Sequence, residues 1–320
     1  MNPTVFGPVR SRRLGKSLGV NLSPVDGKIC SFDCIYCECG LNDERRPKSK
    51  MPSRQSVREA LEARLSAMRD ADDLPEAITY SGNGEPTSHP DFLNIVRDTL
   101  ALRDKYCPQA KVCLLTNATH LNREDVFEAV RLIDRPCLKL DTVDADYIRL
   151  VDRPNARYDV KEVIERIKEL NGRCIVQTMF MQGTFAGQSV DNTTEKYVGP
   201  WLEALAQIRP EGVDIYTLAR ETPVAGLKKA RTANRCGLAV FHLVPLEGYS
   251  ACAGFLRYLD KKRPRTAILH AHLGGIVHAL DGDLGHRNMG QLRAGKVGNP
   301  GRSEERRVGK ECRSRWSPYH

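Results

Sequence analysis

The sequence lacks an apolar run long enough to cross a bilayer, and its first residues lack the pattern of a secretory signal peptide. It also lacks the second C-x2-C knuckle, further along the chain, that structural zinc sites usually contain. Eleven cysteines without an export signal favour a reducing compartment and metal chemistry over a disulfide framework. We therefore expect a cytoplasmic protein with no membrane partner.

The first 230 residues also lack an excess of basic charge, although the whole chain has a formal net charge of +9. They hold 33 Lys and Arg against 33 Asp and Glu, so the entire excess lies in residues 231–320. A basic patch is the usual electrostatic signature of nucleic-acid binding. Residues 1–230 carry no such signature in their net charge, and we expect no DNA partner.

Three thiols do lie close together, in Cys30-Ser-Phe-Asp-Cys34-Ile-Tyr-Cys37. This C-x3-C-x2-C spacing places three sulfurs on one short loop, where they could hold a single metal centre. Cubane iron–sulfur clusters are held by four ligands, so three local cysteines would leave one iron free for another ligand. Structural zinc, with Cys39 as a fourth sulfur, and inert thiols are the alternatives.

The loop resembles the C-x3-C-x-aromatic-C signature of the radical S-adenosylmethionine (SAM) superfamily. Residues Gly7 to Cys39 are most similar to a group described as wyosine-synthetase-related iron–sulfur oxidoreductases, and the likeness covers about residues 5–230. It implies that Cys30, Cys34 and Cys37 hold a [4Fe–4S] cluster whose fourth iron binds SAM, with Tyr36 near the adenine. The enzyme would cleave SAM reductively to a 5′-deoxyadenosyl radical, which abstracts hydrogen from a substrate.

Apolar periodicity after residue 17 predicts six strands that alternate with helices. This alternation favours parallel pairing, and six strands are fewer than a closed eight-stranded barrel needs. We predict an α/β fold, a partial (β/α)6 TIM-like barrel, as the resemblance also implies. Residues 1–17 are interpreted as a solvated basic arm, with contact to an anionic substrate as the alternative. The predicted strands are Leu18–Leu22, Ala77–Ser81, Lys111–Thr116, Cys137–Asp141, Arg173–Met181 and Gly212–Leu218.

Helices are predicted at 53–69, Asp91–Lys105, after an N-cap at Asn122, after a capping box of Asp159 and Glu162, and at 193–207. Ligands of such folds lie at the carboxyl ends of the strands. Polar residues follow or line these ends, so we expect the site there.

The turn Gly82-Asn83-Gly84-Glu85 resembles the superfamily's Gly-Gly-Glu motif but has Asn83 between the glycines. By this resemblance Gly82 and Gly84 let the backbone approach SAM, and Glu85 accepts a hydrogen bond from its ammonium group. A plain turn is the alternative.

Three further residues could contact SAM. Asn117 could bind ribose hydroxyls or the carboxylate, or close an Asx turn. Asp141 could accept from ribose hydroxyls or orient substrate, with Lys139 pointing to the opposite face of its strand. Gln177 could bind the ribose or methionine end, or be a buried polar residue bonded to backbone. No catalytic residue is assigned.

From about residue 231 periodicity weakens, and the sequence becomes rich in Gly and Arg. We interpret residues 1–230 as the core domain and 231–320 as an irregular basic tail, translated after a frameshift near residue 230. A genuine basic tail is the alternative.

The sequence does not identify the substrate, which could be a small molecule, a protein or RNA. An electron donor such as flavodoxin or ferredoxin is the expected partner. Wyosine-type tRNA modification is one alternative function, although the wyosine enzymes carry cysteines ahead of this motif and the chain has none before Cys30. A non-catalytic metal-binding or truncated gene product is another.

Overall fold

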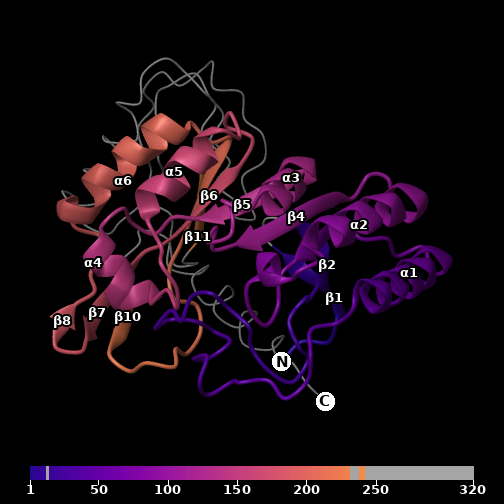
Figure 1. The fold of residues 1–320 in the computed structure, drawn as a ribbon, viewed down its shortest axis with the longest axis horizontal. Coiled ribbons are helices and arrows are strands. Elements are labelled where there is room, and N and C mark those ends of the chain that lie inside the picture. The colour runs from indigo at the N-terminus through magenta and orange to yellow at the C-terminus, as the bar shows by residue number, and fades with distance from the viewer. Residues whose placement is uncertain (12–13, 231–237, 242–320) are drawn as a thin grey trace, which may run out of the picture. The chain divides into compact units, whose positions relative to one another are not determined.

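Six parallel strands form the centre of the sheet in the computed structural model (Figure 1). Each pairs with the next along the chain, and these six strands confirm the predicted α/β fold of a partial barrel. The strands are β2 (Gly15–Val20), β3 (Ala77–Tyr80), β4 (Lys111–Thr116), β5 (Arg135–Lys139), β6 (Ile175–Met179) and β9 (Gly212–Tyr216).

The structure describes residues 1–11, 14–230 and 238–241, which all belong to the unit Met1–Leu280. The predicted tail lies outside the described residues except for β11 (Leu238–Phe241), so its interpretation and the boundary at residue 230 stay predictions. No helix in the described part of the chain is long and apolar enough to cross a membrane. The cytoplasmic location stays a prediction.

An antiparallel strand flanks each edge of the parallel sheet. On one edge β1 (Val5–Ser11) pairs with β2, and on the other β11 pairs with β9. The interpretation of residues 1–17 as a solvated arm is therefore wrong, because most of this segment forms a β-hairpin. Strand β1 is partly exposed along its length and contains Pro8, a residue that sheets tolerate at their edges.

Helices follow the strands and pack side by side, α1 on α2, α2 on α3, and α5 on α6 (Figure 1). Their apolar faces form the main core; in α1, Val57, Leu61, Leu65 and Met68 are all buried. The helices are α1 (Arg54–Asp70), α2 (Phe92–Tyr106), α3 (Glu124–Leu132), α4 (Ala145–Tyr147), α5 (Val160–Lys168) and α6 (Glu195–Ile208), with a 3-10 helix η1 (Pro86–Ser88) and a π-helix η2 (Ile148–Asp152).

Two predicted helix caps differ in the structure. Arg123, not Asn122, precedes α3, and its side chain makes no capping hydrogen bond. Asp159 caps α5 by accepting from the Lys161 N–H at 2.9 Å, but Glu162 pairs with Arg157 instead of closing the box. The helices themselves form because their apolar faces are buried, whatever the cap.

The predicted strand Arg173–Met181 divides into two. β6 ends at Met179, and β7 (Met181–Phe185) turns into a separate sheet with β8 (Gln188–Ser189) and β10 (Leu227–Lys229). A second apolar cluster lies at this point, and it includes Ile35 and Tyr36 from the segment that carries the three clustered cysteines. The small sheet therefore belongs to the surroundings of those cysteines.

Candidate functional site

The cysteine loop, residues 29–40, follows β2 and carries four free thiols of intermediate exposure, Cys30, Cys34, Cys37 and Cys39. One flank of this loop is fixed by the turn after β3. The Ile29 carbonyl accepts from the Glu85 N–H at 2.9 Å, and Ile29 forms a parallel bridge with Gly84. A Cβ on Gly84 would lie 1.9 Å from the Ile29 oxygen, so glycine is required there by the loop's own backbone.

The other flank is fixed by residues 151–155, at the end of the π-helix η2. The Asp33 N–H donates to the Asp152 carbonyl at 3.0 Å, and the Asn155 Nδ2 donates to the Cys30 carbonyl at 2.9 Å. The sequence analysis missed this segment, because a π-helix has no hydrophobic period that would reveal it. Such π-turns occur frequently at functional sites.

Two of the three predicted ligand sulfurs have a polar partner from a different element. The Asn117 Nδ2 lies 3.6 Å from the Cys30 Sγ, and the Cys34 thiol lies 3.6 Å from Asp152 Oδ1. Beside Cys37, the Lys28 amine donates to the Gly40 carbonyl at 2.7 Å.

The thiols differ in how readily they ionise. The neighbouring Cys39 thiol and the Lys28 amine lower the pKa of Cys37 to about 6. Burial, reinforced by Glu85, raises the pKa of Cys30 to about 12, and burial raises that of Cys34 well above its usual value. Metal binding requires thiolates, so occupation of this loop by a metal would release protons from Cys30 and Cys34.

The donor chemistry of the loop fits an iron–sulfur cluster. Within the described ranges no three His, Cys, Asp or Glu side chains converge as a single metal ion would require. A cluster differs from a single ion because each thiolate binds a different iron. Three free thiols on a loop that is fixed on both flanks meet this requirement, whereas a single zinc ion would need them to converge.

Glu85, the predicted acceptor for SAM, is 3% exposed and already receives protein hydrogen bonds. Its Oε1 accepts from Thr87 N at 3.0 Å and from the Thr87 and Thr116 hydroxyls, while Oε2 accepts from Asn117 N at 2.7 Å. The carboxylate thus joins the turn after β3 to the end of β4. Oε2 retains capacity for one more donor.

Asn117 closes the Asx turn that its sequence position suggested, whereas its contact to SAM stays a prediction. Its Oδ1 accepts from the Thr119 N–H at 3.1 Å, which closes the Asx turn. Its Nδ2 donates to the Ser31 hydroxyl at 2.9 Å and lies beside Cys30. The Asx turn therefore holds the amide against the cysteine loop.

Asn83, the departure from the Gly-Gly-Glu motif, is buried and bound to the N-terminal segment. Its Nδ2 donates to the carbonyls of Asn2 at 3.1 Å and Pro24 at 3.0 Å. Gly82 adopts φ +130°, and its carbonyl accepts from the Cys39 thiol at 3.2 Å. The turn thus contacts the cysteine loop at both glycines.

Tyr36 and Asp141 meet in a buried network behind Cys34. The Tyr36 hydroxyl donates to Asp141, whose Oδ1 accepts from the Met179 N–H at 2.9 Å. The Lys139 amine donates to Tyr36 and Asp141, and it lies 3.0 Å from Asp152 Oδ1.

The prediction that Lys139 points to the opposite face is therefore wrong. Residues two apart on a strand share a face, so Lys139 and Asp141 lie together. Burial alone would lower the Lys139 pKa, but Asp141 and Asp152 raise it well above its usual value. The amine is held as a cation.

Gln177 lies in the middle of β6, away from the strand ends. Its Nε2 donates to Asp214 Oδ2 at 3.4 Å on β9. It lines a cavity of about 190 Å³ inside the partial barrel, together with Arg135 and residues of the β1–β2 hairpin such as Phe6 and Leu14.

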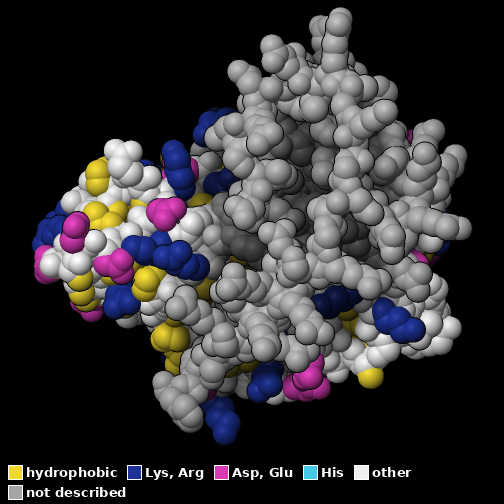
Figure 2. Space-filling model, turned by 180° about the vertical axis from the view of Figure 1, so that it is seen from behind, with side chains coloured by type: hydrophobic (Ala, Val, Ile, Leu, Met, Phe, Trp, Pro, Cys, Tyr) yellow, Lys and Arg dark blue, Asp and Glu magenta, His cyan; other side chains and the backbone are white. Residues whose placement is uncertain are grey.

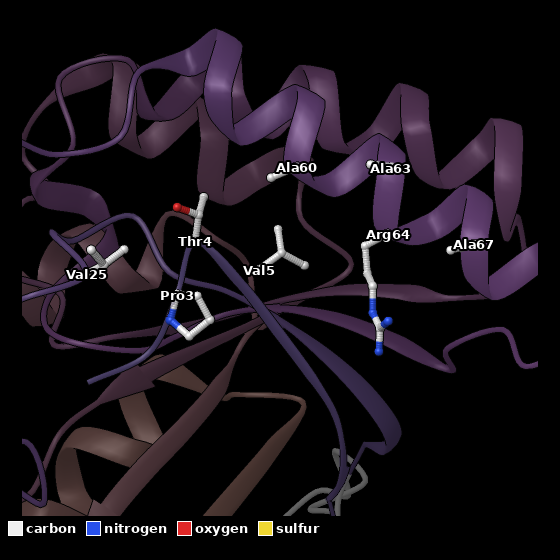
Figure 3. A pocket seen from close by; sticks show the side chains of 8 residues that line it. All are labelled: Pro3, Thr4, Val5, Val25, Ala60, Ala63, Arg64 and Ala67. Atoms are coloured by element: carbon white, nitrogen blue, oxygen red, sulfur yellow. The ribbon is translucent and has the colours of Figure 1, made fainter.

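A second hollow of about 500 Å³ lies between β1 and α1 (Figure 3). Figure 3 shows Arg64 and Thr4 as its polar side chains among alanines, valines and a proline, and the Arg64 guanidinium donates to the Gly7 carbonyl at 2.8 Å. This lining offers no cluster ligand. The hollow is lined by Pro3, Thr4, Val5, Val25, Ala60, Ala63, Arg64 and Ala67.

Comparison with known proteins places the chain in a family. A model of the radical SAM superfamily matches residues 25–188, just over half of the chain. A UPF0026 protein of Synechocystis sp. is 32% identical over 231 residues, which cover 69% of this chain and 78% of that protein. A UPF0026 protein of Helicobacter pylori is 30% identical over 222 residues, 68% of this chain and 67% of that protein.

Other similarities are partial. A protein named GTPase Obg from Brachyspira hyodysenteriae is 28% identical over 218 residues, and the match spans 68% of this chain but 30% of that protein. Among solved structures, Streptococcus suis SuiB bound to S-adenosylmethionine has 17% identity and a TM-score of 0.46, covering 67% of this chain and 44% of that one. A radical SAM methyltransferase from Sphaerobacter thermophilus has 14% identity and a TM-score of 0.47, covering 76% and 63%.

TM-scores below 0.5 add nothing to the assignment, which rests on the family model and the UPF0026 relatives. Members of the matched superfamily are enzymes that use a [4Fe–4S] cluster and SAM. The chain belongs to the radical SAM superfamily and, within it, groups with the UPF0026 proteins.

Proposed function

We propose that Cys30, Cys34 and Cys37 bind a [4Fe–4S] cluster and that the protein cleaves SAM reductively to act on a substrate by hydrogen abstraction. The observation that carries this proposal is the cysteine loop, whose three thiols are free and whose backbone is fixed by the turn after β3 and by residues 151–155. When bound, the cluster and SAM supply one-electron cleavage of the sulfonium C–S bond and a 5′-deoxyadenosyl radical.

The protein's own task is to bind, orient and exclude water. Glu85 Oε2, which accepts one protein donor, is offered as the acceptor for the SAM ammonium. Gly82 and Gly84 keep the turn beside the cysteine loop. Asn117 donates toward Cys30 and is offered as a ribose or carboxylate contact.

Tyr36 and Asp141 act together in this proposal. Because the Tyr36 hydroxyl is bound to Asp141, the ring is held against the network behind Cys34, where it is offered as an adenine contact. Asp141 Oδ1 and Oδ2 are both engaged by protein donors, which favours positioning of Tyr36 over direct substrate contact. Gln177, in the barrel interior, is offered as a contact to the ribose or methionine end of SAM.

The reducing electron would come from a small donor such as flavodoxin or ferredoxin. The surface charge does not favour RNA as the substrate. On the face seen in Figure 2, the described residues show Lys and Arg interspersed with Asp and Glu instead of a basic patch. Wyosine-type tRNA modification and a non-catalytic metal-binding role stay alternatives.

The test uses the full chain, reconstituted anaerobically with iron and sulfide and then given dithionite and SAM. We expect 5′-deoxyadenosine, detected by chromatography, and none from Cys34→Ala. A cluster-loaded protein that forms no 5′-deoxyadenosine would contradict the proposal.

A further inference from the structure

Lys28 places a buried amine directly under the cysteine loop. Its side chain is 1% exposed, and its Nζ donates to the Gly40 carbonyl at 2.7 Å, at the end of that loop. Its backbone N–H donates to the Arg45 carbonyl at 2.7 Å, which fixes the position of the residue. A lysine is rarely this buried unless its charge is compensated.

The partners of this charge belong to the cysteine loop itself. The Lys28 amine binds the Gly40 carbonyl, and the Gly40 N–H in turn donates to the Cys37 carbonyl at 2.9 Å, so the amine lies beside Cys37. Burial lowers the pKa of Lys28, but Cys37, Cys30, Cys34 and Asp33 outweigh it and raise that pKa. Asp33 is the nearest carboxylate, at 3.8 Å, and it also pairs with Arg153 at 3.5 Å. One carboxylate shared between two cations leaves part of the Lys28 charge available to the sulfurs.

A second lysine near the loop, Lys139, has different counter-charges. Lys139 contacts two carboxylates, Asp141 and Asp152, so its charge is more than balanced within its own network. Lys28 is therefore the buried cation whose charge is directed at the predicted ligand sulfurs. Hydrogen bonds to cluster sulfurs and nearby charge are among the factors that set a cluster's reduction potential.

We propose that Lys28 is a positioning residue that raises the reduction potential of the cluster by placing a buried positive charge on the Cys37 side. The inference rests on the proposed function, because it requires the cluster. The step it affects is the uptake of one electron by the cluster from the external donor. Lys28 neither gains nor loses a proton, and its fixed charge stabilises the reduced, more negative state.

The test measures the reduction potential of the reconstituted full chain by a redox titration followed by EPR. Lys28→Met and Lys28→Gln remove the charge, and Lys28→Arg keeps it. Lys50→Met removes an exposed lysine from the connection between the cysteine loop and α1 and serves as the matched control. For the neutral variants we expect about a tenfold lower ratio of reduced to oxidised cluster at a fixed potential, a shift of about 59 mV to more negative values.

We expect Lys28→Arg and Lys50→Met to stay near the wild-type potential. A neutral variant that assembles the cluster with an unchanged potential would overturn the inference while leaving the proposed function intact. Loss of the cluster from both neutral variants would also overturn it, since Lys28 would then build the loop instead of tuning it. A wild-type chain that binds no cluster would overturn the proposed function as well.

Discussion

Each side of the cysteine loop contains a lysine with little exposure to solvent, but the two lysines have different surroundings. On the Cys34 side, Lys139 lies among Tyr36 and two carboxylates, in a network that joins β5 to the π-helix. On the Cys37 side, Lys28 lies under the loop with one carboxylate, which it shares with a second cation.

We infer from this difference that the two lysines have different roles. Two carboxylates hold Lys139 in place and leave it little influence on a nearby cluster, so its contribution is to structure. Lys28 has fewer counter-charges and binds the Gly40 carbonyl beside Cys37, so its contribution is to electrostatics.

The largest effect, loss of the cluster, is expected at the predicted ligands, where the two sides of the loop are equivalent. Cys34→Ala and Cys37→Ala should each abolish cluster binding, because either change removes a thiolate from an iron. Cys39→Ala should keep the cluster. Iron and sulfide content after anaerobic reconstitution measures this, and a cluster of full occupancy in Cys37→Ala together with loss in Cys39→Ala would reassign the ligand set.

The next largest effect, on the free energy of unfolding, distinguishes the two lysines. Lys139→Met should lower the free energy of unfolding of the cluster-free chain by about 3–5 kcal/mol, because it leaves two buried carboxylates without their cation. Lys28→Met should lower it by about 1–3 kcal/mol, the cost of an unpaired Gly40 carbonyl. Urea denaturation measures both, and equal losses would contradict the comparison.

Gly84→Ala tests the contact between the turn after β3 and the start of the cysteine loop. The new Cβ would lie 1.9 Å from the Ile29 oxygen, so the loop must move away from the turn. We expect about a tenfold lower affinity for the cluster, within the range that supporting residues show. Gly199→Ala in α6 is the matched control, since its nearest neighbour is Glu195 Oε1 at 3.5 Å. Iron content titrated against supplied iron gives the answer, and equal affinities would refute a requirement for glycine at 84.

The smallest effect concerns an exposed link to the loop. Arg220 pairs with Glu38 at 2.8 Å, and the two side chains are 75% and 46% exposed. Exposed ion pairs contribute about 0.2–1 kcal/mol, so Arg220→Ala should change the unfolding free energy by no more than that and leave cluster content unchanged. A substantial loss of cluster would show that this pair restrains the loop.

The sequence predicted the parts of the fold that depend on apolar periodicity. The six parallel strands and five longer helices were found because each buries a regular face, as in α1 with Leu61 and Leu65. The β1–β2 hairpin and the small sheet were missed, because short strands with mixed exposure have little period. The π-helix was missed for the same reason.

Among site residues, the sequence indicated those with motif context but not those that support them. Tyr36 with Asp141, and Glu85 with Asn117, form contacts in the structure. Lys28 and Asp152 had no spacing that marked them, since their partners are 5 to more than 100 residues away in the chain. Only the fold brings such charges together.

The most direct test of a three-cysteine cluster open to SAM is the EPR spectrum of the reduced, reconstituted full chain, recorded before and after SAM is added. We predict a [4Fe–4S] signal whose g-values change on addition of SAM, because a ligand binds the iron that lacks a cysteine. A cluster signal that SAM leaves unchanged would contradict the account.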